Sequence, residues 1–375
     1  MAETSVSTAR GPLSVSVGEV TGALGDSVTV LPIVVAVCAL TPASLPHVLL
    51  AFGVFQVAWG VTYGVPMSVE PMKALAGLAI AGSITYPELA AAGLLVGAVL
   101  LVAGATGALS RLASLVGEPT VRGVQLAVAL LLARAGVEAG LASVPLAAAG
   151  VAVVAVLTVA GRSNASALAV LGVGVALAVG RTGAPAPALP ALSVFPTGTP
   201  ALTGDALAGA AGQLAMTVGN AAVATAALCA DLFDRDVSPD ALGRSMGVTC
   251  LAAIPAGGLP MCHGSGGLAG KHEFGARTGG ANLVLGGLYL AAVPIAGVVA
   301  AFPTPLLGVL LGVVALGLAR TALDVGPADP DGGRDWGALA VTVAVGVVGL
   351  AWNVGAAFLL GLVAGRVRSR LASAG

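Results

Sequence analysis

Charged side chains are scarce in this sequence. Only 9% of its 375 residues are Asp, Glu, Lys or Arg, whereas a soluble domain carries about 25%. Aromatic residues are also few, at 3%, while 57% of the residues are hydrophobic and the mean hydropathy is +1.02. So little charge cannot cover a surface that faces water, which excludes a soluble globular protein. The composition predicts an all-α membrane protein with many spanning helices.

Cysteine is equally sparse, and the net charge is close to zero. The cysteines fit neither a disulfide framework nor a paired zinc motif, so we expect no metal and no cofactor. A net charge of −1 gives no indication of a nucleic-acid partner. Residues 1–16 are polar with Arg10 as their only base, which predicts a cytoplasmic tail rather than a cleaved signal peptide. The four cysteines, all in or beside apolar runs, are Cys38, Cys229, Cys250 and Cys262.

Long apolar runs, divided by Gly and Pro, predict about fourteen membrane segments in two sets of seven. The third and tenth are too short to cross a hydrocarbon layer of about 30 Å, which needs about 20 helical residues. We expect each of these two to be a half-helix preceded by an extended strand, over residues 65–69 and 259–263. The predicted segments are 22–40, 47–63, 71–83, 87–108, 121–137, 141–160, 165–180, 204–230, 245–257, 265–274, 279–301, 304–323, 336–350 and 351–366.

Two short motifs recur along the chain at a constant offset. Pro66-Met67 and Pro260-Met261 are 194 residues apart, and the same offset carries Gly25-Asp26 onto Gly219-Asn220. This indicates an internal duplication, and an odd number of segments in each half makes the repeats inverted. Gly- and Pro-interrupted segments at matching places in two halves are the best sequence pointer to a transporter's binding site. The predicted division is a tail over 1–16, a first repeat over 17–181, an extracytoplasmic Pro-rich linker over 182–203 and a second repeat over 204–368.

The basic residues predict the orientation. With fourteen crossings, only Arg134 and Arg181 fall on one side and Lys73 lies within the membrane. All the other bases, Lys271 among them, fall on the side of the two termini. The positive-inside rule therefore places both termini in the cytoplasm, and we expect the membrane to be the plasma membrane.

The first interrupted segment carries Glu70, Pro71 and Lys73. Pro71 suits the first turn of a helix, so Lys73 falls where a cation opposes the helix dipole. A cation at mid-membrane depth also costs about 2.5–3.5 kcal/mol. Lys73 therefore requires a partner, which is either Glu70 in a structural ion pair or a bound anion.

The second interrupted segment begins with Gly264, Ser265 and Gly266. Glycine lets a ligand approach the backbone closely, and the N–H groups at a helix start form an anion site. Inverted repeats would aim the two helix starts at each other. Two half charges and Lys73 then amount to about +2, which favours a doubly charged oxyanion. The alternative to such an anion site is that this stretch forms a solvent-exposed loop between two spans.

Further polar residues lie within apolar runs. Gln213, Thr217 and Asn220 are spaced i, i+4 and i+7, on one face of a helix. Such a stripe indicates a functional site, with helix–helix contact as the alternative. His263 is a ligand contact, a proton carrier or a packed residue. The residues predicted to bind substrate are Asp26, Ser68, Glu70, Lys73, Gln213, Thr217, Asn220, His263, Gly264, Ser265 and Gly266.

The block at 260–279, which begins Pro-Met-Cys-His-Gly-Ser-Gly-Gly, resembles the signature of the molybdate transporter family, a branch related to the sulfate permeases. Similar blocks stand at 22–26, 70–74, 121–126 and 213–221, so the resemblance spans nearly the whole chain. It implies a seven-plus-seven inverted-repeat fold, with a core domain from segments 1–4 and 8–11 and a gate domain from segments 5–7 and 12–14. It also implies molybdate or sulfate as the substrate.

Two departures from the family's pattern fall in the predicted site. The family usually has Pro-Val-Gln where residues 68–70 are Ser-Val-Glu, and Gln-Tyr-Arg where residues 271–273 are Lys-His-Glu. A carboxylate beside an anion site weakens anion binding unless it is protonated or paired with Lys73. Glu70 and His263 are therefore the candidates for carrying a coupled proton.

The sequence thus predicts a secondary active transporter, not an enzyme, for a tetrahedral oxyanion, with molybdate first and sulfate second. The core domain would carry the anion past the gate domain in an elevator-like movement, as the resemblance implies. A nucleobase-type carrier of the same fold and an anion channel are the alternatives. We expect membrane lipid to surround the protein, and the sequence allows a homodimer as well as a monomer.

Overall fold

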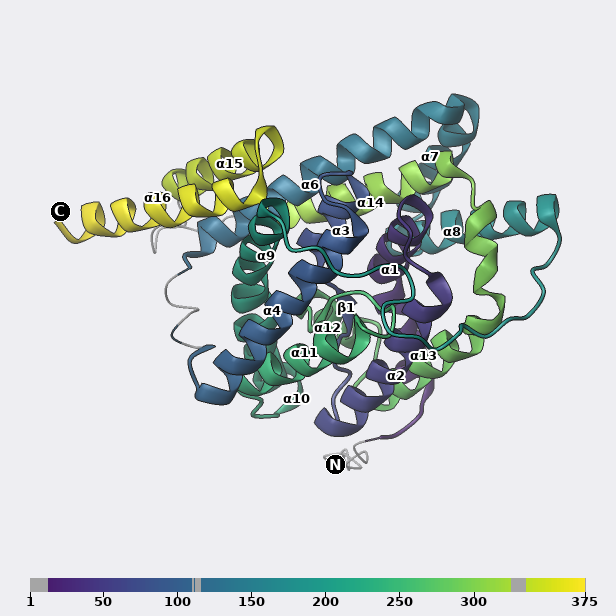
Figure 1. The fold of residues 1–375 in the computed structure, drawn as a ribbon, viewed down its shortest axis with the longest axis horizontal. Coiled ribbons are helices and arrows are strands. Elements are labelled where there is room, and N and C mark those ends of the chain that lie inside the picture. The colour runs from purple at the N-terminus through teal and green to yellow at the C-terminus, as the bar shows by residue number, and fades with distance from the viewer. Residues whose placement is uncertain (1–12, 110, 112–115, 325–334, 375) are drawn as a thin grey trace, which may run out of the picture.

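The computed structural model describes residues 13–109, 111, 116–324 and 335–374, and this part of the chain is almost entirely helical (Figure 1). Most of the predicted tail over 1–16, Arg10 included, lies outside the described residues. Within them, eight stretches of helix are long and apolar enough to cross a membrane, as expected of an integral membrane protein. The eight are Val17–Leu40, Leu45–Tyr63, Tyr86–Thr106, Glu118–Val159, Ala165–Thr182, Gly204–Phe233, Gly280–Ala301 and Thr304–Leu323.

The elements follow one another in the order of the apolar runs. In the first half they are α1 (Val17–Leu40), α2 (Leu45–Tyr63), β1 (Glu70–Pro71), α3 (Lys73–Ile80), α4 (Tyr86–Thr106), α6 (Glu118–Gly140), η1 (Leu141–Ser143), α7 (Val144–Val159) and α8 (Ser163–Thr182). In the second half they are α9 (Gly204–Met216), η2 (Thr217–Ala224), α10 (Thr225–Phe233), α11 (Pro239–Ala253), β2 (Met261–Cys262), α12 (Ser265–Glu273), α13 (Gly280–Ala292), η3 (Val293–Ala301), α14 (Thr304–Leu323), α15 (Trp336–Ala351) and α16 (Val354–Ala374).

The observed elements differ from the predicted segments in three local features. α1 begins at Val17 rather than at residue 22, because the Ser16 side chain accepts the N–H of Glu19 and caps the helix. The run over 279–301 changes from an α-helix to a 3₁₀-helix at η3, where Pro294 has no N–H to continue the α-helical ladder. The run over 204–230 contains the π-helical stretch η2 between α9 and α10.

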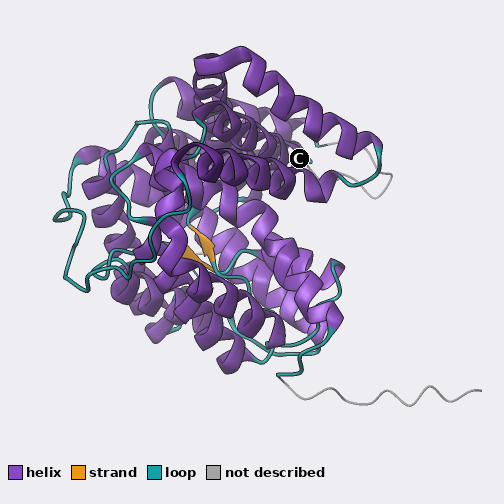
Figure 2. Ribbon diagram, turned by 90° about the vertical axis from the view of Figure 1, so that its right-hand side faces the viewer, coloured by secondary structure: helices purple, strands orange, loops and turns teal. Residues whose placement is uncertain are grey.

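The helices pack in pairs drawn from the two halves of the chain. α6 lies against α14 and α15, α4 against α11, and α2 against α13. In Figure 1, α6, α14, α15 and α16 run together along one side of the molecule. β1 and β2 lie near the centre, with helices on all sides of them (Figure 2). The interior of the molecule is therefore formed by both halves together.

The predicted Pro-rich linker lies close along the ends of three elements. The N–H of Ala188 donates to the carbonyl oxygen of Pro294 over 2.9 Å, and that of Phe195 to Pro255 over 2.8 Å. The N–H of Ala201 donates to the carbonyl of Pro87 over 2.9 Å. The linker therefore joins the start of η3, the end of α11 and the start of α4 on one face of the molecule.

Glycine allows the α2–α13 and α4–α11 pairs to approach closely. A Cβ atom added at Gly286 would lie 2.8 Å from the carbonyl oxygen of Gly53 and 2.7 Å from the Val57 side chain. One added at Gly247 would lie 2.7 Å from the carbonyl oxygen of Gly97. Helix association in lipid depends on van der Waals packing and is favoured by small residues at the contact. These crossings therefore leave no room for a side chain.

We expect Gly286→Val to destabilise the protein by about 1–3 kcal/mol, because the added methyl groups collide with α2. Gly287→Val is the matched control, since this neighbouring residue of α13 is exposed and an added Cβ there has no atom within 4 Å. Thermal unfolding of both purified variants in detergent measures the difference. Equal melting temperatures for the two would contradict the close approach of α2 and α13.

Candidate functional site

Two extended stretches meet near the centre of the molecule as an antiparallel pair (Figure 2). Glu70 of β1 stands opposite Cys262 of β2, and the N–H of Met72 donates to the carbonyl oxygen of Pro260 over 2.9 Å. Prolines in both stretches favour this backbone, because the residue before a proline avoids the helical region. The pairing brings together the two extended stretches that lead into α3 and α12.

Glu70, which is buried, forms an ion pair at the start of α3 with Lys73, whose side chain is 18% exposed. Its carboxylate lies 2.5 Å from Lys73 Nζ and accepts a hydrogen bond of 2.9 Å from Ser68 Oγ. A Cβ atom added at Gly264 would lie 2.5 Å from this carboxylate, and one added at Gly267 would lie 2.1 Å from it. The carboxylate thus packs against the backbone at the start of α12. Of the two partners that the sequence allows for Lys73, the structure contains the ion pair.

Gln213 caps the start of α3. Its Oε1 accepts the N–H groups of Ala74 and Leu75 over 3.0 and 3.3 Å, and its Nε2 donates to Thr217 Oγ1 over 2.8 Å. These N–H groups belong to the first turn of α3, where a helix has no partner of its own for them. Two members of the predicted polar stripe therefore reach the site, and Gln213 occupies the position that an anion would take at α3.

The start of α12 has no cap of this kind. Its N-cap residue, Gly264, provides no side-chain hydrogen bond, and Gly266 is exposed with no atom within 4 Å of an added Cβ. The Glu70 carboxylate packs against Gly264 and Gly267 on the inner side. Beside Gly266, the Ser265 hydroxyl donates to Asn220 Oδ1. Asn220 lies in η2, and π-helical stretches recur at functional sites. The two helix starts, which the sequence suggests are equivalent, therefore differ, because Gln213 accepts the first N–H groups of α3 whereas the start of α12 has an exposed glycine and the Glu70 carboxylate beside it.

Asn220 also lines a cavity of about 370 Å³ between η2 and α6. This volume lies in the usual range of small-molecule pockets. Gln125 and Arg122 add polar groups to its wall, and the Arg122 guanidinium is held 2.7 Å from Glu118 Oε1. Because Asn220 also holds Ser265, the cavity adjoins the start of α12.

Both ring nitrogens of His263 are engaged within the protein. Nδ1 lies 2.8 Å from the carbonyl oxygen of Ser68, and Nε2 lies 2.8 Å from Ser245 Oγ. The ring also packs edge-on against Trp59 and Tyr63. His263 therefore fastens the stretch before β1 to α2 and α11, which agrees with the packing role among the three that the sequence allows.

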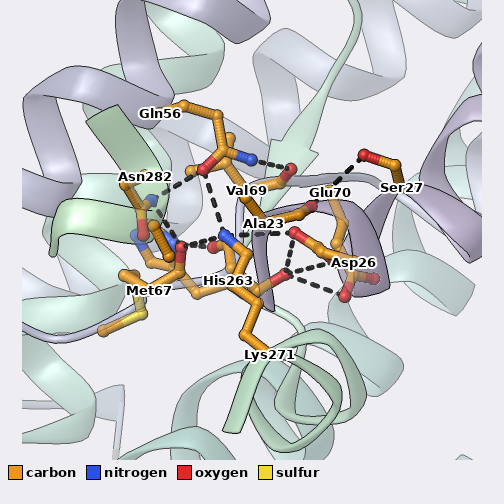
Figure 3. Close-up of polar contacts among 12 residues, drawn as sticks. Ala23, Asp26, Ser27, Gln56, Met67, Val69, Glu70, His263, Lys271 and Asn282 are labelled. Carbon is orange, nitrogen blue, oxygen red and sulfur yellow. Dashed lines mark hydrogen bonds and ion pairs between the residues drawn. The ribbon is translucent and has the colours of Figure 1, made fainter. Parts of the chain in front are cut away.

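A second ion pair, which is fully buried, lies beside the first. Lys271 Nζ is 3.2 Å from Asp26 Oδ2, and both side chains are 0% exposed (Figure 3). The sequence counts Lys271 with the bases on the side of the termini, whereas the structure buries its side chain inside the protein. α12 is only nine residues long and packs on α1, so its last turn is still inside the protein. An ammonium group withdrawn from water requires a charged partner, which Asp26 provides.

The four charges of these two ion pairs balance one another. Ser68 links the two pairs, because its hydroxyl lies 3.4 Å from Asp26 Oδ1 as well as 2.9 Å from Glu70 Oε1. Two carboxylates offset Lys73 and Lys271, so the sum of about +2 expected from the sequence does not hold. The positive potential that remains is that of the helix starts, about half a charge each. A dianion therefore requires one carboxylate to move away or to take up a proton.

Three residues of this cluster, Lys271, Gln56 and Asn282, are not among the site residues predicted from the sequence. Gln56 Oε1 lies 3.2 Å from Lys271 Nζ and accepts from Asn282 Nδ2 over 2.6 Å. Gln56 and Asn282 are isolated polar residues in the apolar runs over 47–63 and 279–301. Polar residues within membrane segments indicate functional sites by default, so this signal was present in the sequence.

Known proteins resemble the chain along most of its length. Residues 18–132 and 205–318 match a family described as molybdate transporters of the MFS superfamily. Molybdate transporter 2 of Arabidopsis thaliana is 30% identical, over 84% of this chain and 80% of its own. Molybdate transporter 1 of Chlamydomonas reinhardtii is 28% identical, over 92% and 90%. These relatives are transporters and not enzymes.

Solved structures show the same fold. The transmembrane domain of a cyanobacterium bicarbonate transporter, BicA, matches with a TM-score of 0.63 at 15% identity, over 92% of this chain and 96% of its own. The murine anion transporter Solute Carrier 26 family member A9, in the inward-facing state, matches with a TM-score of 0.66 at 12% identity, over 94% and 68%. At these identities the similarity concerns the fold alone. The sequence match covers more than half of the chain, with β1 and α3 in its first part and β2 and α12 in its second, and the chain therefore belongs to the molybdate transporter family.

Proposed function

We propose that the protein is a secondary active transporter of a tetrahedral oxyanion, with molybdate as its first substrate and sulfate as the next. The observation that carries this proposal is the start of α12 beside the Lys73–Glu70 pair. Main-chain N–H groups at a helix start and a nearby ammonium suit an anion. The relatives named as molybdate transporters indicate which anion to test first.

The membrane arrangement that we propose has fourteen segments in two inverted repeats, with both termini in the cytoplasm. α3 and α12 would be half-helices that end within the membrane. The helix contacts support a duplication, since exchanging the two halves turns the α4–α11 contact into the α13–α2 contact. The same exchange turns α1–α12 into α9–α3. Segments 1–4 and 8–11 would then form the core domain, and segments 5–7 and 12–14 the gate domain.

The oxyanion would enter from the cavity at Asn220 and replace the Glu70 carboxylate at the start of α12. Ser265 and the N–H groups of α12 would bind its oxygens, with Lys73 released from Glu70 to provide the opposite charge. The remaining residues predicted to bind substrate would support this site: Gln213 and Thr217 by capping α3, and Asp26, Ser68, His263, Gly264 and Gly266 by shaping the junction of the two helix starts.

Glu70 is the group that we propose to carry a coupled proton. A protonated Glu70 no longer opposes a dianion and keeps its contact with Ser68. Several charged and titratable groups face Glu70, which lies in β1. They are Lys73 at the start of α3, Asp26 across Ser68, and Lys271, His263, Cys262 and Tyr289 from the second half of the chain. His263 is less suited to this role, because both of its ring nitrogens are already bonded.

We expect Lys73→Gln to weaken molybdate binding by about tenfold or more, because a hydrogen bond to a charged group contributes about 1.5–3 kcal/mol. Calorimetric titration of the purified protein measures the dissociation constant. Arg134→Gln is a control, since Arg134 is also paired with a carboxylate, at 2.9 Å from Glu138, but both groups are exposed and such pairs contribute little.

The double variant Lys73→Gln/Glu70→Gln separates two roles for Lys73. If Lys73 contacts the anion, binding by the double variant stays weak. If Lys73 only neutralises Glu70, binding recovers, and the direct role is excluded. Uracil that displaces labelled molybdate from the wild-type protein would favour the nucleobase-carrier alternative instead.

We expect Glu70→Gln to remove the dependence of transport on the proton gradient. In the wild type, protonation of Glu70 favours the dianion, so binding should fall as the pH rises through the titration of this group. A neutral glutamine keeps the size of the side chain, and binding by this variant should stay high across the same range. Labelled-molybdate uptake into proteoliposomes, with and without an imposed pH gradient, measures the effect. Wild-type uptake that ignores the gradient, together with a fully active Glu70→Gln variant, would rule out this role.

A further inference from the structure

The Lys271 ammonium group is surrounded by oxygen atoms that come from three separate parts of the chain. Nζ lies 2.9 Å from the carbonyl oxygen of Met67, 3.2 Å from Gln56 Oε1 and 3.2 Å from Asp26 Oδ2. The side chain is 0% exposed, and Figure 3 shows Gln56, Met67 and Asp26 gathered around it. The group is therefore a positive charge enclosed by a carboxylate, an amide oxygen and a main-chain carbonyl.

This set of donors is the kind that binds an alkali-metal cation. Hard cations take carboxylate, amide and carbonyl oxygens, and in membrane transporters unwound backbone carbonyls coordinate Na⁺ beside the substrate site. Met67 lies in such an extended stretch, directly before β1.

Asn282 holds two of these oxygen atoms in place, and its own side-chain oxygen has no partner. Its Nδ2 donates to both Gln56 Oε1 and the carbonyl oxygen of Met67, each over 2.6 Å. Its Oδ1 is buried and has no hydrogen-bond partner in the described part of the structure. The cluster thus contains a fourth oxygen that is not used while the ammonium group is present.

We propose that Lys271 is a built-in cation, which occupies a site that would otherwise take Na⁺ from solution. The protein then needs no alkali-metal cation at this position. Removing the side chain beyond Cβ opens a site for Na⁺ or for a small alkylammonium ion, held by Asp26, Gln56 and Met67. The statement about transport rests on the proposed function, whereas the statement about cation binding does not.

The position of this charge relates it to the anion site. Asp26 is the carboxylate that Lys271 neutralises, and Ser68 bridges Asp26 to Glu70. Without a cation at this position, Lys73 would face the two carboxylates alone, and one negative charge would be uncompensated. A permanently attached cation keeps the Lys73–Glu70 pair balanced whatever the salt outside.

Lys271→Ala tests the proposal through thermal unfolding of the purified protein, without substrate. The variant is compared in choline chloride, sodium chloride and propylammonium chloride, the last of which restores the missing atoms of the side chain. We expect its melting temperature to be lowered in choline and raised by several degrees by Na⁺ or propylammonium. The wild type should respond equally to the three salts, because its site is already filled.

Two matched variants show where the added cation binds. Lys271→Ala/Asp26→Asn removes the carboxylate and should not respond to Na⁺ or propylammonium. Lys271→Met fills the space without a charge and should also lack the response. Rescue that persists in either variant would place the cation elsewhere and overturn the proposal.

Wild-type uptake gives an independent test. Labelled molybdate should enter proteoliposomes equally well in sodium and in choline buffers, and uptake that requires Na⁺ would overturn the proposal. A folded Lys271→Ala variant that responds to neither cation would overturn it as well, and so would one that cannot be recovered in any of the three salts. If the wild type does not transport molybdate at all, the proposed function fails while the unfolding experiments still decide the cation site.

Discussion

The pairing of β1 with β2 is the contact on which the site depends. The backbone groups and charged side chains that it brings inside the protein all need hydrogen-bond or ion-pair partners. The pairing places irregular backbone and four charged side chains within a protein whose surroundings provide little water. Unpaired N–H groups, carbonyls and charges are costly there. Residues on several surrounding elements provide these partners. Gln213 caps α3, Lys73 pairs with Glu70, and Lys271 pairs with Asp26. The arrangement of the surrounding helices follows from keeping these partners in place.

The parts of the structure that could be predicted from the sequence depend on local signals. Apolar runs divided by Gly and Pro place the helices to within a few residues, as with the run over 71–83 and the observed α3. The Lys73–Glu70 pair was foreseeable because the two residues are three apart, although the predicted place of Pro71 in the first helical turn is wrong, since Pro71 belongs to β1 and α3 begins at Lys73. The polar stripe at Gln213, Thr217 and Asn220 was likewise visible from its spacing alone.

The parts that could not be predicted depend on contacts between distant segments. Lys271 lies near the end of a short predicted segment, and nothing in its local sequence shows that its side chain pairs with Asp26, which is 245 residues away. The expected symmetry of the two helix starts also fails for a non-local reason. Gln213 reaches α3 with its side-chain amide, whereas Asn220 of the same polar stripe binds a hydroxyl at α12. Repeated motifs therefore locate such a site without fixing what each half contributes to it.

The π-helical stretch η2 has a consequence for how this helix can change during evolution. It begins at Thr217, after Gln213, which caps α3, and it contains Asn220, which binds Ser265 at the start of α12. Deleting one residue between Gln213 and Asn220 would rotate all that follows by about 100° relative to what precedes it. Asn220 would then face away from Ser265 although no side chain at the site had been replaced. We therefore infer that this segment tolerates substitutions away from the site far more readily than insertions or deletions. Its length should be conserved more strictly than its amino-acid composition.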